Sequence, residues 1–194
     1  MSSSTDQLRK IRDQIIKFTS SPLYRHRIQN HYLPVIGEGK HHASTVFIAE
    51  APGIQEARTG HHFVGPSGQI LDQLLDSINL KRQDIYLTNI IKDKLPQNRD
   101  PRPQEIQAYA PFLLNQLQII KPKTIVALGH FSTNYLLSLC HQPIKPLSQI
   151  HGQTITIKTS YGTSSLVPMF HPSAALYNPS LISQMKQDFL ILKN

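Results

Sequence analysis

Two short apolar runs, far apart in the sequence, each lead into a polar loop whose residues could do chemistry. The run 45–49 opens into Glu50-Ala51-Pro52-Gly53, and an aromatic residue, Phe63, follows a little further on. The run 167–170 opens into His171-Pro172-Ser173. In an open α/β sheet, loops at the carboxyl ends of parallel strands converge on one ligand crevice. A carboxylate, an aromatic ring and a histidine in such loops therefore predict one active site built from two distant segments.

The elements that would position these loops alternate between helix-like and strand-like patterns. Apolar residues at helical spacing predict helices over residues 4–18, 65–78, 103–120, 131–139 and 179–192. Short apolar or alternating runs predict strands over residues 45–49, 85–87, 124–128, 154–157 and 166–169, with 154–157 at a sheet edge. This alternation predicts a three-layer α/β/α sandwich with a short, mainly parallel central sheet and right-handed crossovers.

The length and charge of the chain narrow the class of protein. With 194 residues, we expect a single domain over 1–194, in which 1–43 form an N-terminal helix and an ordered wrap and 44–194 form the catalytic core. Lys and Arg number 20 against 12 Asp and Glu, which leaves a net charge of +8. This excess favours a polyanionic partner, because phosphate contacts release counterions. A basic surface that only keeps the protein soluble is the alternative.

Cysteine and histidine usage excludes several kinds of site. The only cysteine, Cys140, rules out an internal disulfide framework and an all-cysteine metal site within one chain. The adjacent pairs His41-His42 and His61-His62 do not predict a metal site, because neighbouring histidines rarely chelate one ion. The sequence shows neither a signal peptide nor an apolar run long enough to span a bilayer, so we expect a cytoplasmic protein without membrane contact. We also expect a monomer.

Five short motifs occur in an order and spacing that resemble the uracil-DNA glycosylase superfamily, and within it family 4, the thermophile-type enzymes: Ala49–Gly53, Phe63–Gly65, Tyr86–Asn89, Pro96–Arg99 and His171–Ser173. The resemblance covers about residues 37–179. It implies an enzyme of base-excision repair that flips uracil, or another deaminated base, out of DNA and hydrolyses its N-glycosidic bond. It implies no metal or redox cofactor in the chemistry. The preference among uracil, hypoxanthine and xanthine stays open.

The resemblance assigns base recognition to Phe63 and Asn89. Phe63 resembles the ring on which the flipped base stacks, although core packing would also suit a phenylalanine here. Asn89 resembles the amide that reads the base edge, although it could instead cap a loop. An amide pairs with uracil N3–H and O4, whereas its donor would meet the amino group of cytosine, which is also a donor.

The resemblance assigns the chemical step to His171 and Glu50. His171 resembles the histidine that hydrogen-bonds uracil O2 as negative charge develops there. Glu50 resembles the carboxylate at the pocket floor that orients water and faces the sugar cation. Ala51 stands where other branches of the superfamily have an aspartate that activates water, so the identity of that group stays open. Glu56 resembles a family 4 acid that lines the pocket, or is a solvated loop charge, and Ser173 completes the substrate-binding set.

Basic residues in the loops on the same side fit phosphate contacts that position DNA without reading sequence: Arg58, Lys92, Lys94, Arg99 and Arg102. Leu176, in the turn after His171, resembles the tip that wedges into the base stack when the uracil leaves.

The chain departs from family 4 at the iron–sulfur cluster. Two of the four cysteines that the resemblance implies would align with Asp93 and Tyr109, and the Thr19–Tyr32 region that should hold the other two has no cysteine. We therefore expect no cluster, with the region held by packing around Phe18, Tyr24 and Tyr109. Ala49 and His62 also replace a glycine and a proline of the family, which leaves the shape of the pocket open.

Two other readings of the sequence differ in class. One is a catalytically silent module that binds nucleic acid or uracil and has kept the fold; the intact set Glu50, Phe63, Asn89 and His171 argues for the enzyme instead. The other is a Rossmann-like nucleotide-binding enzyme, which is disfavoured because no Gly-x-Gly-x-x-Gly follows the first predicted strand.

Overall fold

The computed structural model describes residues 3–193. Within this range a six-stranded sheet has the order β1-β3-β2-β4-β6-β5. Parallel pairing joins the central strands β3 (Tyr86–Asn89), β2 (Thr45–Ala49), β4 (Thr124–Leu128) and β6 (Gly162–Met169). The edge strands β1 (Glu38–Gly39) and β5 (Ile155–Thr159) pair antiparallel. The predicted α/β sandwich with a mainly parallel sheet is confirmed.

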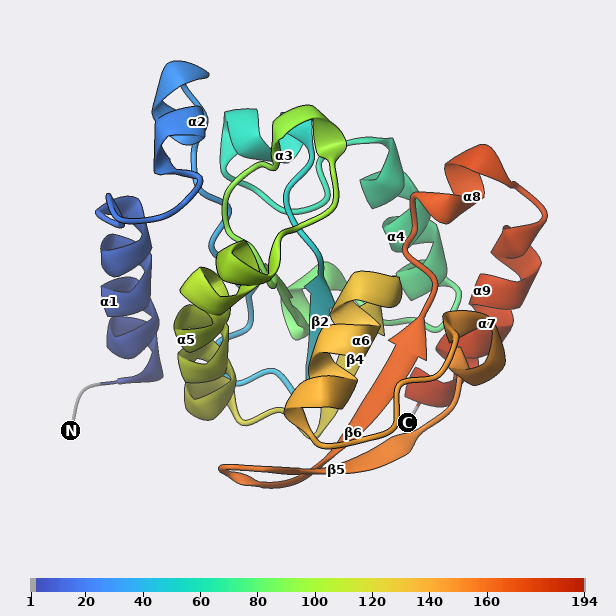
Figure 1. Ribbon diagram of the computed structural model, residues 1–194. Coiled ribbons are helices and arrows are strands. Elements are labelled where there is room, and N and C mark those ends of the chain that lie inside the picture. The colour runs from blue at the N-terminus through green and yellow to red at the C-terminus, as the bar shows by residue number, and fades with distance from the viewer. Residues whose placement is uncertain (1–2, 194) are drawn as a thin grey trace.

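Helices cover both faces of the sheet, and the side chains of β2 show how. Val46 and Ile48 belong to the core on the side of α5 (Pro103–Ile120) and α6 (His130–Leu139). Phe47 and Ala49 point to the other core, which α4 (Pro66–Asp76) and α9 (Leu181–Phe189) complete. Because successive side chains of a strand face opposite ways, a strand buried on both faces is apolar throughout. The helix α1 (Ser4–Ile16) lies outside this sandwich, beside α5 (Figure 1).

The order of the strands locates the crevice. From β2 the chain passes through α3 (Ile54–Thr59) and α4 to β3 on one side, and then crosses through α5 to β4 on the other side of β2. The direction of winding therefore reverses at β2. In open α/β sheets a ligand crevice forms at such a switch point, outside the carboxyl ends of the strands.

Several short elements were not predicted from the sequence. They are the helices α2 (Tyr24–Gln29), α3, α7 (Leu147–Ile150) and α8 (Ala174–Tyr177), the strand β1, and the 3₁₀ turns at Arg82–Asp84, Pro96–Asn98 and Leu190–Leu192. Segments this short show no apolar periodicity that would mark them. None of the helices in the described part of the chain has the length and apolar character that crossing a bilayer requires.

A buried polar network attaches the N-terminal segment to the core. Arg27 of α2 donates a hydrogen bond to Asp93 at 3.2 Å and to the main-chain carbonyls of Ile15 (3.2 Å) and Ile16 (3.0 Å) at the end of α1. Tyr109 of α5 donates its hydroxyl to the second carboxylate oxygen of Asp93. Burial raises the pKa of Asp93, while Tyr109 and Arg27 act in the opposite direction. One carboxylate thus joins α1, α2 and α5.

This network occupies the positions at which the family resemblance implies cysteine ligands. Iron–sulfur clusters are held by thiolates. Here the side chains of Asp93 and Tyr109 are hydrogen-bonded to each other, and the Ser21 hydroxyl lies 2.6 Å from the Tyr109 hydroxyl. The ring of Phe18 packs edge-on against Tyr109, with ring centroids 5.6 Å apart. Cys140 is the C-cap of α6, in a different part of the fold. The residues present here do not fit a cluster.

The network makes a prediction about stability. Tyr109→Phe should lower the free energy of unfolding by about 1–3 kcal/mol, because it leaves a buried carboxylate oxygen without its donor. Combined with Asp93→Asn in a double-mutant cycle, measured by urea denaturation, the two changes should be strongly non-additive. Tyr177→Phe, at a side chain that is 90% exposed, is the matched control and should cost little. Additive effects of Asp93→Asn and Tyr109→Phe would show that the two groups are not coupled.

Candidate active site

The loops at the carboxyl edge of the sheet enclose a pocket of about 380 Å³. Its lining includes residues from the end of β2, from the end of β3 and from the turn after β6. Most of the residues expected from the sequence meet here: Glu50, Ala51, Glu56, Phe63, Asn89, Lys94, Arg99, His171 and Ser173. Arg58, Lys92 and Leu176 do not line it.

Asn89 brings a free amide to the pocket. It is the last residue of β3 and pairs with Ala49 of β2, so the register of two parallel strands fixes its position. The residue is only 3% exposed. Its main-chain carbonyl accepts a hydrogen bond from Lys92, but no group among residues 3–193 hydrogen-bonds its side chain. The amide therefore keeps both a donor and an acceptor for a ligand.

His171 is held as a neutral hydrogen-bond donor. The main-chain N–H of Ser173 donates to its Nδ1 at 3.1 Å, and the Ser173 hydroxyl lies 2.7 Å from the same atom. Because Nδ1 accepts from the backbone, the single proton of the neutral ring is on Nε2. Burial lowers the pKa of His171 to about 4. At neutral pH the ring thus presents an uncharged Nε2–H.

Phe63 forms a wall of the pocket beside this histidine. The two rings are stacked, with centroids 5.7 Å apart and an angle of 27° between their planes. Phe63 has a φ of +51°, a region that a bulky residue adopts only when its surroundings impose it. A Cβ on Gly68 would lie 1.7 Å from the Phe63 carbonyl oxygen, so only glycine permits this approach of α4.

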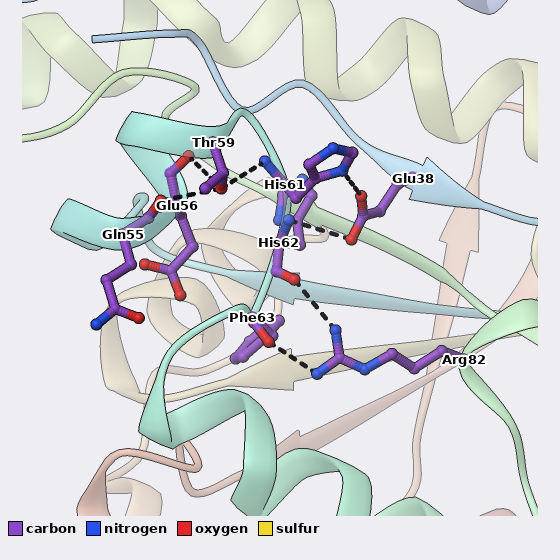
Figure 2. Close-up of polar contacts among 8 residues, drawn as sticks. All are labelled: Glu38, Gln55, Glu56, Thr59, His61, His62, Phe63 and Arg82. Carbon is purple, nitrogen blue, oxygen red and sulfur yellow. Dashed lines mark hydrogen bonds and ion pairs between the residues drawn. The ribbon is translucent and has the colours of Figure 1, made fainter.

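Hydrogen bonds from both sides hold the loop that carries Phe63 (Figure 2). Arg82 donates to the main-chain carbonyls of His62 at 3.1 Å and of Phe63 at 2.8 Å. On the other side, the carboxylate of Glu38 accepts from the His62 N–H at 3.1 Å and lies 2.9 Å from Nδ1 of His61. These hydrogen bonds hold the loop so that Phe63 keeps its strained backbone conformation.

Burial disfavours the charge of the Glu50 carboxylate, which lines the pocket. It raises the pKa of Glu50 to about 7, and Asp100 adds to the shift while Lys94 opposes it. Burial also lowers the pKa of Lys94, against the attraction of Glu50 and Glu56. The Glu56 carboxylate lies against Gly53 in the loop after Glu50, because a Cβ added to Gly53 would be 2.4 Å from Oε2 of Glu56.

The basic residues expected to contact phosphates divide into different groups. Lys92 is wholly buried beneath the end of β3, so its assignment as a phosphate contact is wrong. Lys94 is also buried and bonds the Leu95 carbonyl and Asn98, which places it in the pocket wall rather than on the surface. Arg99 lines the pocket and forms an ion pair with Glu105 of α5. Arg58, in the last turn of α3, is exposed. Runs of basic residues in a loop do not reveal which of them face inward.

Other pocket residues escaped the sequence reasoning. Tyr177 lines the pocket and is 90% exposed, whereas the neighbouring Leu176 is 45% exposed and lies outside the lining. His62 and Asn98 also line it, and His62 Nε2 is buried without a hydrogen-bond partner in the described residues. His62 directly precedes Phe63 and Asn98 directly precedes Arg99, so their positions beside motif residues could have predicted that they line the pocket. Across residues 3–193, no three His, Cys, Asp or Glu side chains gather closely enough to hold a metal ion.

The fold and this pocket define an α/β enzyme whose site lies at the carboxyl edge of a parallel sheet. The model of the Uracil DNA glycosylase superfamily matches residues 36–191. A type-4 uracil-DNA glycosylase of Sulfurisphaera tokodaii is 37% identical over 185 residues, which cover 95% of this chain and 82% of the relative. The type-4 enzyme of Archaeoglobus fulgidus is 35% identical over 164 residues, 84% of this chain and 81% of the relative. That of Thermotoga maritima is 35% identical over 170 residues, 88% and 83% of the two chains.

The chain therefore belongs to the uracil DNA glycosylase superfamily. The resemblance inferred from the short motifs is confirmed, and with it the expected enzyme class.

The shifted carboxylate predicts how stability depends on pH. Folding raises the pKa of Glu50 from its ordinary 4.5 to about 7. Between these values the unfolded chain releases the Glu50 proton and the folded chain retains it, so this group destabilises the fold as pH rises from 4.5 to 7. Glu50→Gln should therefore raise the melting temperature at pH 7 and above, and the gain should disappear below pH 4.5. Equal melting temperatures at every pH would contradict the buried environment of Glu50.

Proposed function

We propose that this protein removes uracil from DNA by flipping the nucleotide into the pocket and hydrolysing its N-glycosidic bond, as a step of base-excision repair. One observation supports this most strongly: a free amide on Asn89 and an uncharged donor on His171 converge in a single pocket. Both groups suit a neutral, planar base with carbonyl edges. Extraction of the nucleotide from the stack costs a few kcal/mol, which contacts with the flipped base offset.

Base recognition rests on Asn89 and Phe63. The Asn89 amide accepts from uracil N3–H through its oxygen and donates to O4 through its nitrogen. The ring of Phe63, locked by the clamped loop, offers a flat surface for the base. Glu56 lines the pocket next to Gly53 and restricts the space around the base.

The bond between C1′ and N1 breaks with its electron pair passing to the base, where the charge spreads to O2. His171 donates an Nε2–H hydrogen bond to O2, and this contact strengthens as the charge develops. A neutral donor keeps its proton and stabilises the anion, which later takes a proton from water. Water adds its oxygen to C1′ and releases a proton, so the products are free uracil and an abasic sugar.

Glu50 acts on the opposite partner, the sugar. In its ionised form the carboxylate stabilises the cation at C1′ and orients the attacking water, whereas the methyl group of Ala51 does neither. Because burial raises the pKa of Glu50 to about 7, the active form gains population as pH rises through that value.

The DNA duplex lies across the pocket mouth in this proposal. The net charge of +8 and the exposed Arg58 favour phosphate contacts. Leu176 and Tyr177 fill the space left by the flipped nucleotide in this proposal, which their exposure on α8 supports. We propose further that the protein acts as a monomer. We also propose that it has no iron–sulfur cluster, which the hydrogen bond between Asp93 and Tyr109 at the cluster positions supports.

The direct test is to incubate the protein with DNA that contains one uracil, treat with alkali and measure strand cleavage. His171→Ala should lower the single-turnover rate by roughly 10²–10³-fold, typical for the loss of one such donor, with little change in DNA affinity. Ser173→Ala should cost less, because the Ser173 N–H still fixes the tautomer. His130→Ala, at an exposed histidine outside the pocket, is the control. If the wild-type protein binds this DNA and leaves it intact, it is a silent binding module and the proposed activity is wrong.

Discrimination against cytosine gives a separate prediction. Asn89→Asp should slow uracil excision by a factor equivalent to about 1–3 kcal/mol and admit cytosine, whose amino group a carboxylate accepts. The assay compares single-turnover rates on matched duplexes that contain uracil, cytosine, hypoxanthine or xanthine. Asn115→Asp, at an exposed site on α5, introduces the same charge away from the pocket. Unchanged uracil kinetics in Asn89→Asp would show that Asn89 only supports its loop.

A further inference from the structure

Lys92 is a buried lysine that the chemistry above does not use. Its side chain is wholly buried. The Nζ atom lies 2.6 Å from the Thr88 hydroxyl, 2.6 Å from the Asn89 carbonyl oxygen and 2.8 Å from Oε1 of Gln116. Among residues 3–193 no carboxylate forms an ion pair with it. An unpaired buried ammonium is costly, so a lysine retained in such a place calls for a reason.

The surroundings of Nζ match the protonated form. An ammonium has three N–H donors, and three acceptors surround this one. Two of them are carbonyl oxygens, which only accept. The third, the Thr88 hydroxyl, directs its own hydrogen to the Ile36 carbonyl at 3.0 Å, which leaves its oxygen free to accept. Burial lowers the pKa of Lys92, and the three acceptors oppose that shift, because a neutral amine would direct a lone pair at one of these oxygens.

The charge lies directly beneath the base-binding group. One of the acceptors is the main-chain carbonyl of Asn89, whose side chain forms part of the pocket. The field of Lys92 also reaches the pocket wall: burial lowers the pKa of His62 to about 3, and Lys92 contributes to that shift. A buried charge acts at longer range than an exposed one, because little water screens it.

We propose that Lys92 is a positioning residue that holds Asn89 in place and whose positive charge stabilises the uracil anion as the glycosidic bond breaks. This inference rests on the proposed function. His171 meets the departing charge at O2 by a direct hydrogen bond, and Lys92 acts from below through the end of β3. His171 thus stabilises the uracil anion through a hydrogen bond, and Lys92 stabilises the same anion through its electrostatic field.

The test uses leaving groups of different quality. The fluorine of 5-fluorouracil withdraws electrons, so its anion needs less stabilisation than that of uracil. Lys92→Met keeps the length and apolar stem of the side chain and removes the charge. Single-turnover excision of uracil should fall roughly 10- to 100-fold, and excision of 5-fluorouracil should fall less. The ratio of the 5-fluorouracil rate to the uracil rate should therefore rise about threefold or more.

Tyr86→Phe provides the control. It removes the hydroxyl that Gln116 contacts at 3.3 Å and disturbs the same network, but leaves the three acceptors around Lys92 in place. Its effect, whatever the size, should be equal for the two bases. An equal loss for both bases in Lys92→Met, with DNA affinity retained, would overturn the electrostatic role and leave Lys92 as a support for Asn89.

Two further measurements cover the case in which Lys92→Met does not fold. Lys92→Gln retains a hydrogen-bond donor without the charge and should show the same rise in the rate ratio. In the His171→Ala protein, where Lys92 is intact, NMR of ¹⁵N1-labelled uracil in the product complex should still show an N1 pKa below that of free uracil, and an unchanged value would overturn the proposal. If wild-type protein excises neither base, the proposed function itself fails; if it excises both and the ratio does not respond, only the role of Lys92 fails.

Discussion

Parallel pairing of β2 with both β3 and β4 is the constraint on which the site depends. The register Ala49 with Asn89 brings the carboxylate loop after β2 and the amide at the end of β3 to the same edge of the sheet. The pairing of β4 with β6 extends that edge to His171, whose Cβ lies 3.3 Å from where a Cβ on Gly129 would be. A slip of one residue would turn the Asn89 amide into the opposite core. Side chains from three distant segments therefore reach one pocket because backbone hydrogen bonds align their strands.

Burial at the carboxyl edge of the sheet gives the ionisable groups there their chemical character. Burial raises the pKa of Glu50 and lowers that of His171 and of Lys92. For His171 the result is a neutral ring whose proton the Ser173 N–H directs to Nε2. For Glu50 it is a carboxylate whose charge depends on the pH range in which the enzyme works. In the proposed reaction, the same low dielectric that disfavours these charges would strengthen their action on a transition state in which charge separates.

The N-terminal region shows how one kind of link between segments can stand in for another. A cluster would join distant segments through metal–thiolate bonds. Here a single buried carboxylate, Asp93, joins α1, α2 and α5 through Arg27 and Tyr109. The arrangement satisfies both oxygens of the carboxylate, as a buried charge requires. It also couples the N-terminal segment to the loop after β3, because Asp93 lies four residues after Asn89, the last residue of that strand.

The sequence by itself determined the α/β sandwich, the order of its main elements and the residues at the ends of its strands. These features follow from apolar periodicity and from short motifs, which are contained in stretches of a few residues. The tertiary structure alone decided that Lys92 faces inward beneath Asn89, that Lys94 lies in the pocket wall, and that Tyr177 rather than Leu176 borders the pocket. It also decided the tautomer of His171 and the environment of Glu50. Burial and hydrogen bonding of this kind depend on contacts between segments that are distant in sequence, and no local pattern of residue types records them.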